Sequence, residues 1–349
     1  MSKKTVFIIG AGASKEIGLP TGNELRETIS RLLNLQFDFS GIINNGDSGL
    51  YQAIRNHVES TGRERAEINE YIGAARDISS AIIQATSIDD FIDSHRSDDR
   101  IAFCGKLAIA KSILDAERRS DLFNKNINFD GLLNYEALDK TWYGELLKLL
   151  IANCEIEEFK TRIKDITFIV FNYDRCLEQY LYYAVKNFYK ISDTQALEII
   201  NLFNIFHPYG LVGELWPEPN YEKIPYGTEP STAQLLKISK QIKTFSEALD
   251  FSTSEIEIIR NTIRDAHKII FLGFAFHPIN MQLLTPTELS NRPHLARTYA
   301  TTFGLSDSDT EVIEQEIATL GGHAIDARTK SMKCYELFHE YSRAIALGT

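Results

Sequence analysis

The stretch Val6-Phe7-Ile8-Ile9-Gly10-Ala11-Gly12-Ala13-Ser14 decides the fold of this chain. Its run of β-branched and aromatic residues predicts a buried strand. The run stops at two glycines one residue apart, and a serine follows. Glycine lets the backbone approach a ligand closely, so N–H groups at such a strand end can bind a diphosphate. The stretch therefore predicts a nucleotide near residue 10.

Further short apolar runs resemble the first one and indicate more strands of the same kind. They occupy residues 166–171, 202–206, 268–272 and 296–301. Because these runs show little alternation of polar and apolar residues, they favour a parallel sheet covered on both faces. Helical spacing separates them, at residues 23–35, 176–189, 254–266 and 307–320. This order predicts an α/β fold, a Rossmann-like doubly wound parallel sheet.

Between Asn23 and Asp165 the sequence shows helical, charged segments and no convincing strand. We therefore expect one domain over residues 1–349, with residues 36–160 as a large helical insertion or subdomain. Residues 310–349 are expected to complete the domain with a strand and helices. The helical region is either a site of oligomer contacts or a lid over a pocket.

Composition limits the function classes. The chain has 349 residues, 44% of them hydrophobic, and a net charge of −11. This charge argues against a general nucleic-acid-binding surface. No apolar segment is long enough for a signal peptide or a membrane span, so we expect a cytoplasmic protein. Four widely spaced cysteines form no Cys-x-x-Cys pair, and we expect neither a zinc site nor disulfides: Cys104, Cys154, Cys176 and Cys334.

The glycine turn departs from the dehydrogenase fingerprint. A third glycine is expected at position 15, where Lys15 stands, and no second strand with a terminal acid follows. The turn continues instead into a shaped Gly/Pro loop before the next helix, in which Thr21 is a candidate ligand contact. The alternative is that Gly10 and Gly12 only make a tight strand-to-helix turn.

Polar residues follow the other predicted strands, where ligands lie in open parallel sheets. Asn172 and Asp174 follow the second strand, and His207 begins His-Pro-Tyr-Gly after the third. An Asn offers a donor and an acceptor to a ribose or a water, and a His can act as a general base. In the alternative interpretation, Asp174 caps a helix, Asn172 holds a turn and His207 is structural. The loop from Gly273 to Asn280, with His277 as a weaker candidate, completes the set.

The order of these motifs resembles the sirtuin-like NAD-consuming domain, in particular the bacterial sirtuin-like proteins of antiphage defence systems. The motifs are Gly-Ala-Gly-Ala-Ser, Asn-Tyr-Asp, His-Pro-Tyr-Gly and Gly-Phe-Ala-Phe-His-Pro-Ile-Asn. Segments 87–92 and 298–307 also resemble that branch, and the resemblance covers about residues 5–310.

The resemblance implies a role for each matching residue. Asn172 would position the ribose and the attacking water, and His207 would be the catalytic histidine. Asp174 would support the nicotinamide end of the pocket. The remaining matches would bind the diphosphate or the adenosine half of NAD: Gly10, Ala11, Gly12, Ser14, Gly273, Phe274, Asn280 and Thr301 or Thr302.

One departure narrows the expected activity. Sirtuin deacetylases carry four zinc-binding cysteines in two close pairs, and this chain has no such pairs. We therefore expect an NAD+ glycohydrolase that needs no metal or other cofactor and uses NAD+ as substrate. Nicotinamide leaves as a neutral molecule, so Asn172 would place the water while a near-neutral His207 accepts a proton. The alternatives are a catalytically silent NAD or ADP-ribose sensor that gates a partner and an NAD-dependent protein deacylase or ADP-ribosyltransferase.

The resemblance also implies how such an enzyme is controlled. Depletion of NAD+ in antiphage defence requires a silent resting state, released by a partner or by assembly. The family forms homo-oligomers, and some systems add a separately encoded HerA-like motor ATPase or an Argonaute-type partner.

Overall fold

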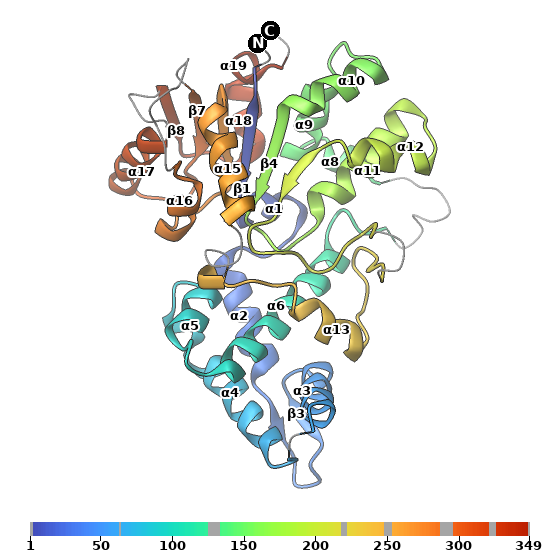
Figure 1. Ribbon diagram of the computed structural model, residues 1–349, viewed down its shortest axis with the longest axis vertical. Helices are drawn as coiled ribbons and strands as arrows, with labels where there is room; N and C mark the ends of the chain where they lie inside the picture. The colour runs from blue at the N-terminus through green and yellow to red at the C-terminus, as the bar shows by residue number, and fades with distance from the viewer. Residues whose placement is uncertain are drawn as a thin grey trace.

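A six-stranded parallel sheet forms the centre of the protein (Figure 1), in the order β5-β4-β1-β6-β7-β8. The computed structural model describes residues 3–62, 64–124, 133–217, 222–247, 253–286, 296–320 and 326–347. Counted along the chain, the strand order is 3-2-1-4-5-6, the doubly wound order of nucleotide-binding folds. The predicted α/β class with a Rossmann-like sheet is thereby confirmed. The strands are β1 (Thr5–Ile9), β4 (Ile166–Val170), β5 (Asn204–Phe206), β6 (Lys268–Leu272), β7 (Arg297–Thr301) and β8 (Asp326–Lys330).

Strand β1 shows why the strands are apolar on both faces. Successive side chains of a strand point to opposite sides, and all five residues of β1 are buried. Val6 and Ile8 join one hydrophobic core, and Phe7 and Ile9 join the other. The sheet thus lies between two separate cores, each covered by helices.

Helices pack on both faces of the sheet. One face of the sheet is covered by α9 (Trp142–Ile151), α10 (Ile156–Arg162), α11 (Cys176–Tyr189), α12 (Asp193–Ile200) and α18 (Cys334–Glu340). The other face contacts α15 (Thr253–Asp265), α16 (Pro278–Leu284) and α17 (Asp307–Leu320). Short helices α1 (Ala11–Ser14), α8 (Tyr135–Leu138) and α19 (Ser342–Ile345) lie at turns.

A second group of helices forms a lobe at the carboxyl end of β1 and β4 (Figure 1). We call this group the helical lobe. It consists of α2 (Gly22–Leu33), α3 (Ser48–Ser60), α4 (Glu67–Ala81), α5 (Ile88–Ser94), α6 (Asp99–Arg119) and α13 (Thr232–Ser239). Helix α13 is distant in sequence but packs against α3 and α6. The lobe is therefore assembled from two separate parts of the chain.

The region expected as a helical insertion, residues 36–160, divides between the two lobes. Its first part builds the helical lobe, whereas α9 and α10 cover the sheet. Trp142 and Phe159 of these helices share a core with Phe7 of β1. Residues 63 and 125–132 of this region, and residues 321–325 and 348–349 of the C-terminal region, lie outside the described residues.

Several predicted boundaries were wrong. Residues 23–165 do contain strands, namely β2 (Gln36–Phe37) and β3 (Ile43–Asn45), which pair in an antiparallel hairpin. Such short strands give no hydrophobic period, and their turn depends on the Asp38 carboxylate, which accepts hydrogen bonds from two backbone N–H groups. The third strand begins at Asn204 rather than Leu202, and the fifth at Arg297 rather than Ala296. The sixth, β8, is a polar edge strand without an apolar run.

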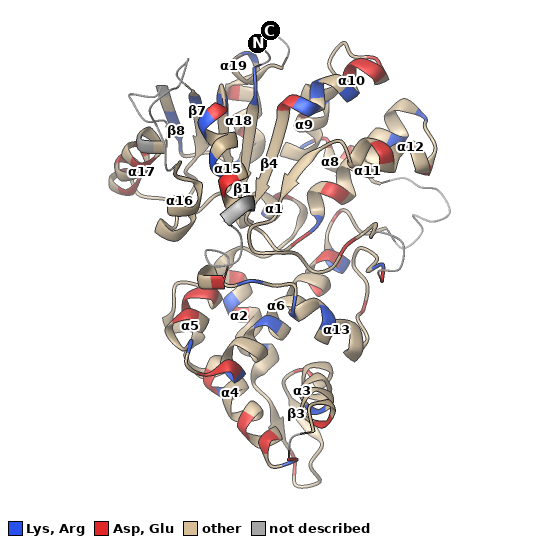
Figure 2. Ribbon diagram, viewed as in Figure 1, with Lys and Arg blue, Asp and Glu red and all other residues tan. Residues whose placement is uncertain are grey.

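Charged residues of both signs are spread over the two lobes (Figure 2). Acidic residues stand out on α4, α5, α10 and α17, with Lys and Arg among them. Among the helices that the structure describes, none has the length and apolar character needed to cross a membrane.

Candidate functional site

The glycine turn lies at the point where the strand order reverses. Strands β1 and β6 are neighbours there, and the loops that follow them pack together. The N–H of Gly10 donates to the Leu272 carbonyl, and the N–H of Gly12 donates to the Gly273 carbonyl, both at 3.0 Å. In doubly wound folds, ligands bind outside the carboxyl edge of the sheet at the point where the strand order reverses.

The structure gives the glycines a packing role. A Cβ atom on Gly10 would lie 2.5 Å from the Gly273 carbonyl oxygen and 2.7 Å from the Phe274 Cα. Gly273 itself has a φ of +55° and meets the backbone of Ala13, so it too must be glycine. The N–H groups of Gly10 and Gly12 are already used within the protein. Diphosphate binding by this turn stays a prediction. The alternative, a tight turn, is supported by the close contact of Gly10 and Gly12 with the Gly273 backbone.

Three of the predicted site residues are joined in one hydrogen-bonded chain. Asn172 Nδ2 donates to the Gly10 carbonyl and to Ser14 Oγ, each at 3.1 Å. Ser14 Oγ in turn donates to Asp174 Oδ2 at 3.0 Å. All three side chains are buried where the loops after β1 and β4 meet. The sheet thus brings residues 14, 172 and 174 together, as the strand-end pattern predicted.

The same chain leaves one strong acceptor without a partner. Both bonds of the Asn172 side chain come from its amide nitrogen, which orients the amide. Its Oδ1 atom is buried and accepts no hydrogen bond within the described residues. Buried polar groups are almost always paired, so an unpaired amide oxygen at this edge is a place where a bound hydroxyl or water would be stabilised.

His207 forms an ion pair with a residue that the sequence analysis did not single out. Its Nε2 lies 2.6 Å from Glu178 Oε1, and its Nδ1 lies 3.4 Å from the Asn172 carbonyl oxygen. Burial by itself lowers the pKa of His207, but the Glu178 carboxylate outweighs burial and holds this pKa above its ordinary value. Burial would raise the pKa of Glu178, and His207 instead keeps it low. The pair therefore favours a charged imidazolium over the near-neutral histidine that the sequence analysis expected.

Asp174 bonds to both its neighbouring segments. Its Oδ1 accepts the Cys176 N–H at 3.1 Å just before α11, whose N-cap is Arg175 and not Asp174 as one interpretation expected. Its other oxygen accepts the hydrogen bond from Ser14. Burial raises the pKa of Asp174, although both hydrogen bonds oppose this shift.

The remaining predicted contacts lie around this cluster in different roles. Thr301 Oγ1 accepts the Gly273 N–H at 2.9 Å, and Thr302 Oγ1 is buried without a partner among the described residues. Asn280 accepts a hydrogen bond from Tyr209, and Phe274 packs against Phe171 in an aromatic cluster.

Two further candidates lie at the starts of helices. Thr21 is the N-cap of α2 in a capping box with Glu24, a structural role that the sequence analysis did not assign. Ala11 begins helix α1. Nearby, Phe276 adopts a φ of +53°, a conformation that costs a bulky residue energy and that recurs at functional sites.

Other residues of the site region were missed. Glu178 lies in the first turn of α11, where an acid is ordinary, so no local signal marks it. Tyr173 donates to Asp89 Oδ1 of α5 at 2.7 Å, and burial raises the pKa of Asp89 to about 7. In the sequence, segment 87–92 stands out only for its family resemblance, which assigns Asp89 no role.

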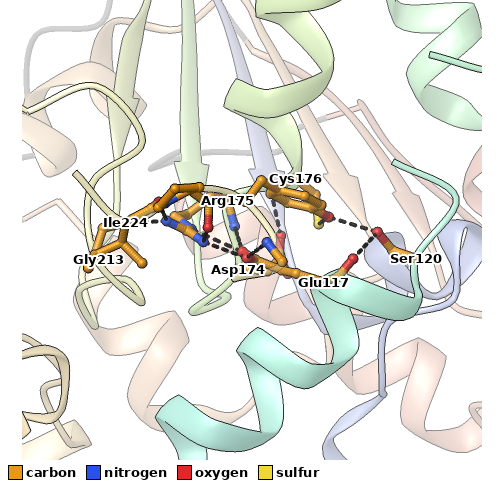
Figure 3. A network of polar contacts seen from close by, with 10 residues as sticks. Glu117, Ser120, Asp174, Arg175, Cys176, Gly213 and Ile224 are labelled. Atoms are coloured by element: carbon orange, nitrogen blue, oxygen red, sulfur yellow. Dashed lines mark hydrogen bonds and ion pairs between the residues drawn. The ribbon is translucent and has the colours of Figure 1, made fainter. Parts of the chain in front are cut away.

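A buried ion pair lies directly beside the cluster (Figure 3). Arg175 follows Asp174 in the chain and contacts Glu117 of α6, with Nη2 and Oε2 at 2.5 Å. Arg175 also donates to the carbonyls of Gly213, Ile224 and Pro225. This network joins the sheet and the helical lobe to Gly213 and to residues 224–225.

No group of three or more His, Cys, Asp or Glu side chains suited to a metal ion occurs in the described ranges. A scan against models of protein families found no match for this chain, and a search of curated proteins found no relative.

Proposed function

We propose that this protein hydrolyses the bond between ribose and nicotinamide in NAD+, giving ADP-ribose and nicotinamide. One observation carries the proposal: the buried, unpaired Oδ1 of Asn172 at the carboxyl edge of a doubly wound sheet. Such an acceptor is suited to a ribose hydroxyl or to the attacking water. The motif order and the strand order both support a dinucleotide in this crevice.

In the proposed reaction the C–N glycosidic bond breaks and its electron pair goes to the nicotinamide nitrogen. The oxygen of water bonds to the ribose carbon, and the water proton is released. Because nicotinamide is a neutral leaving group, the protein must mainly fix the ribose, stabilise the cationic transition state and place the water. Asn172 would hold the water or the ribose hydroxyl. The Asn172 side chain is itself positioned by Ser14, which Asp174 binds.

His207 would receive the proton through Nδ1, whose 3.4 Å contact with the Asn172 carbonyl is long enough to be exchanged for a substrate group. Glu178 orients the ring from the other nitrogen, as a carboxylate does for a catalytic histidine. Only the neutral imidazole can accept a proton, so the raised pKa of His207 predicts that activity increases with pH around and above neutrality.

We also propose, on the motif resemblance, an effector of antiphage defence that depletes NAD+ when a partner or self-assembly activates it. Its setting would be the cytoplasm. Homo-oligomers and a separately encoded ATPase or Argonaute-type protein are the proposed partners.

One observation favours a second candidate, a silent NAD or ADP-ribose sensor. Both ring nitrogens of His207 have partners in the protein, so the histidine is suited to a structural role as well. A sensor would bind NAD+ and release it unchanged.

The deciding experiment incubates the purified protein with NAD+ and measures nicotinamide and ADP-ribose by chromatography. It is run with the protein alone and with the product of the neighbouring gene. Release of both products in equal amounts supports hydrolysis. Binding of NAD+ by calorimetry without release in either condition would support the sensor instead. An acyl-lysine peptide with NAD+ tests for deacylation in the same assay.

A further inference from the structure

A pocket lies at α11, outside the Asn172 cluster. It has a volume of about 340 Å³ and is lined by residues of α11, by residues 123–124 after α6, and by residues within 215–216 and 223–228. Its lining contains none of residues 14, 172, 174 and 207. This volume falls within the range of small-molecule sites.

The walls of this pocket are fixed by the buried Arg175–Glu117 pair (Figure 3). Arg175 binds the carbonyls of Ile224 and Pro225, and Glu117 accepts the Gly227 N–H at 3.1 Å. Residues 224–227, three of which line the pocket, are thus tied to α6 and to the start of α11. A preformed site loses less entropy when a ligand binds.

Inside the pocket one polar side chain is buried but unused. Gln179 is only 6% exposed, and its amide forms no hydrogen bond to any part of the chain that the structure describes. An amide combines a donor and an acceptor, and a ligand in the pocket could contact both. The pocket therefore presents a ready donor–acceptor pair.

Much of the rest of the lining consists of aromatic side chains and one lysine. Four aromatic side chains line it: Phe123, Tyr183, Trp216 and Tyr226. Lys223 is exposed at the same pocket and forms no ion pair within the described residues. Aromatic walls stack a planar base, a glutamine amide pairs with the N6/N7 edge of adenine, and an exposed lysine attracts a phosphate.

We propose that this pocket binds an adenine nucleotide, with the base against the aromatic side chains and Gln179 and the phosphate at Lys223. The site is independent of the NAD+ cleavage proposed above. Loss of one would leave the other intact.

The test is titration calorimetry of the full chain with AMP, with adenosine, GMP and inorganic phosphate as comparison ligands. We expect AMP to bind with a Kd below about 1 mM. AMP should bind more tightly than adenosine, and GMP should bind at least about tenfold more weakly than AMP. No binding of AMP in this range, or equal binding of AMP and GMP, would overturn the proposal.

Variants of the lining residues test where AMP binds. Gln179→Leu keeps the side-chain volume and should weaken AMP about tenfold. Lys223→Ala should weaken AMP but not adenosine, whereas Lys240→Ala, another exposed lysine outside the pocket, should change neither. Because Lys223 is exposed, this pair of variants stays informative even if Gln179→Leu is unstable. NAD+ cleavage without AMP should be unchanged in all three.

A last variant separates this pocket from the NAD+ site. Asn172→Ala should retain AMP binding at wild-type strength. If instead Asn172→Ala abolishes AMP binding while Gln179→Leu leaves it unchanged, AMP occupies the strand-end crevice and the proposal is wrong.

Discussion

Two buried polar networks lie side by side after β4, and they differ in how completely their atoms are paired. In the first, all five N–H groups of the Arg175 guanidinium are used, on Glu117 and on three backbone carbonyls. In the second, Asn172 Oδ1 and Glu178 Oε2 are buried and unpaired within the described residues. Asp174 of the second network and Arg175 of the first are neighbours in the chain.

The difference separates a structural network from a candidate site. A saturated network holds parts of the chain together, and nothing further is gained from a ligand there. Unpaired acceptors instead carry a cost that a ligand or water can remove. Because burial and sequence position are nearly the same, pairing is the property that distinguishes the two.

The largest expected effect is the loss of stability when the fully paired Arg175–Glu117 network is changed. Glu117→Gln leaves the Arg175 charge buried without a counter-charge and should lower the free energy of unfolding by about 3–5 kcal/mol, measured by urea denaturation. Where the variant still folds, its NAD+ cleavage should be close to that of the wild type. The double variant Glu117→Met/Arg175→Met should recover much of the stability. If Glu117→Gln lowers the free energy of unfolding only slightly, the proposed difference between the two networks is wrong.

The next largest effect is expected on NAD+ cleavage, when Asn172 of the incompletely paired network is changed. Asn172→Ala should reduce the rate of NAD+ cleavage about 100-fold or more, because it removes the group that holds the water or ribose. Its unfolding free energy should fall by only about 1–2 kcal/mol, for the two bonds of Nδ2. Asn204→Ala, an exposed asparagine on β5, is the matched control and should keep full activity. A large loss of stability without loss of turnover would make Asn172 structural.

The glycine turn tests whether packing or ligand approach explains its sequence. Gly10→Ala places a Cβ 2.5 Å from a backbone oxygen and should cost about 1–3 kcal/mol of stability. Gly22→Ala, with nothing within 4 Å of its Cβ, should be neutral or slightly stabilising. Thermal unfolding with calorimetry measures both. If Gly10→Ala has normal stability and only NAD+ binding is lost, the role of the turn is ligand approach alone.

Asp89 gives a stability effect that depends on pH. Its pKa of about 7 in the folded protein exceeds its ordinary value of 3.8. The neutral carboxyl therefore contributes stability that is complete below 3.8 and is lost as the pH rises through about 7. Asp89→Asn still accepts from Tyr173 but cannot ionise. Relative to the wild type it should gain up to about 4 kcal/mol as the pH rises from about 4 to about 7, with no further gain above that range. Parallel pH curves for both proteins would contradict this.

The smallest effect is expected at the ion pair of the site. Glu178→Gln removes the charge that raises the pKa of His207, so the acid limb of the pH–rate profile should move to lower pH. The profile of kcat/KM for NAD+ measures this shift. A shift to higher pH would mean that His207 acts in its protonated form.

The sequence predicted the class of the fold well because β1, β4 and β6 are buried on both faces and therefore apolar throughout. It failed for β2 and β3, which are short, and it located β8 only within residues 310–349, because β8 is polar and has no apolar run. It also could not place α13 beside α6, since nothing local in a helix names its distant partner.

At the site, the sequence pattern alone predicts that Ser14, Asn172 and Asp174 lie together, because the ends of parallel strands share one edge of the sheet. The partner of His207 was missed, since Glu178 is a common type of residue at a common helix position. The pattern also indicates that Gly10 and Gly12 are open to a ligand, whereas the structure places Gly273 against them.

The sequence by itself determined the parallel sheet and the group of polar residues at its edge, whereas the reversal of strand order beside β1 came from the structure. The sheet and its polar edge follow from local hydrophobicity and from the geometry of strand ends, which act over a few residues. Only the tertiary structure decided which buried polar atoms are paired. Pairing joins residues such as Glu117 and Arg175, or Glu178 and His207, across long stretches of chain, and no local pattern encodes the distance between them.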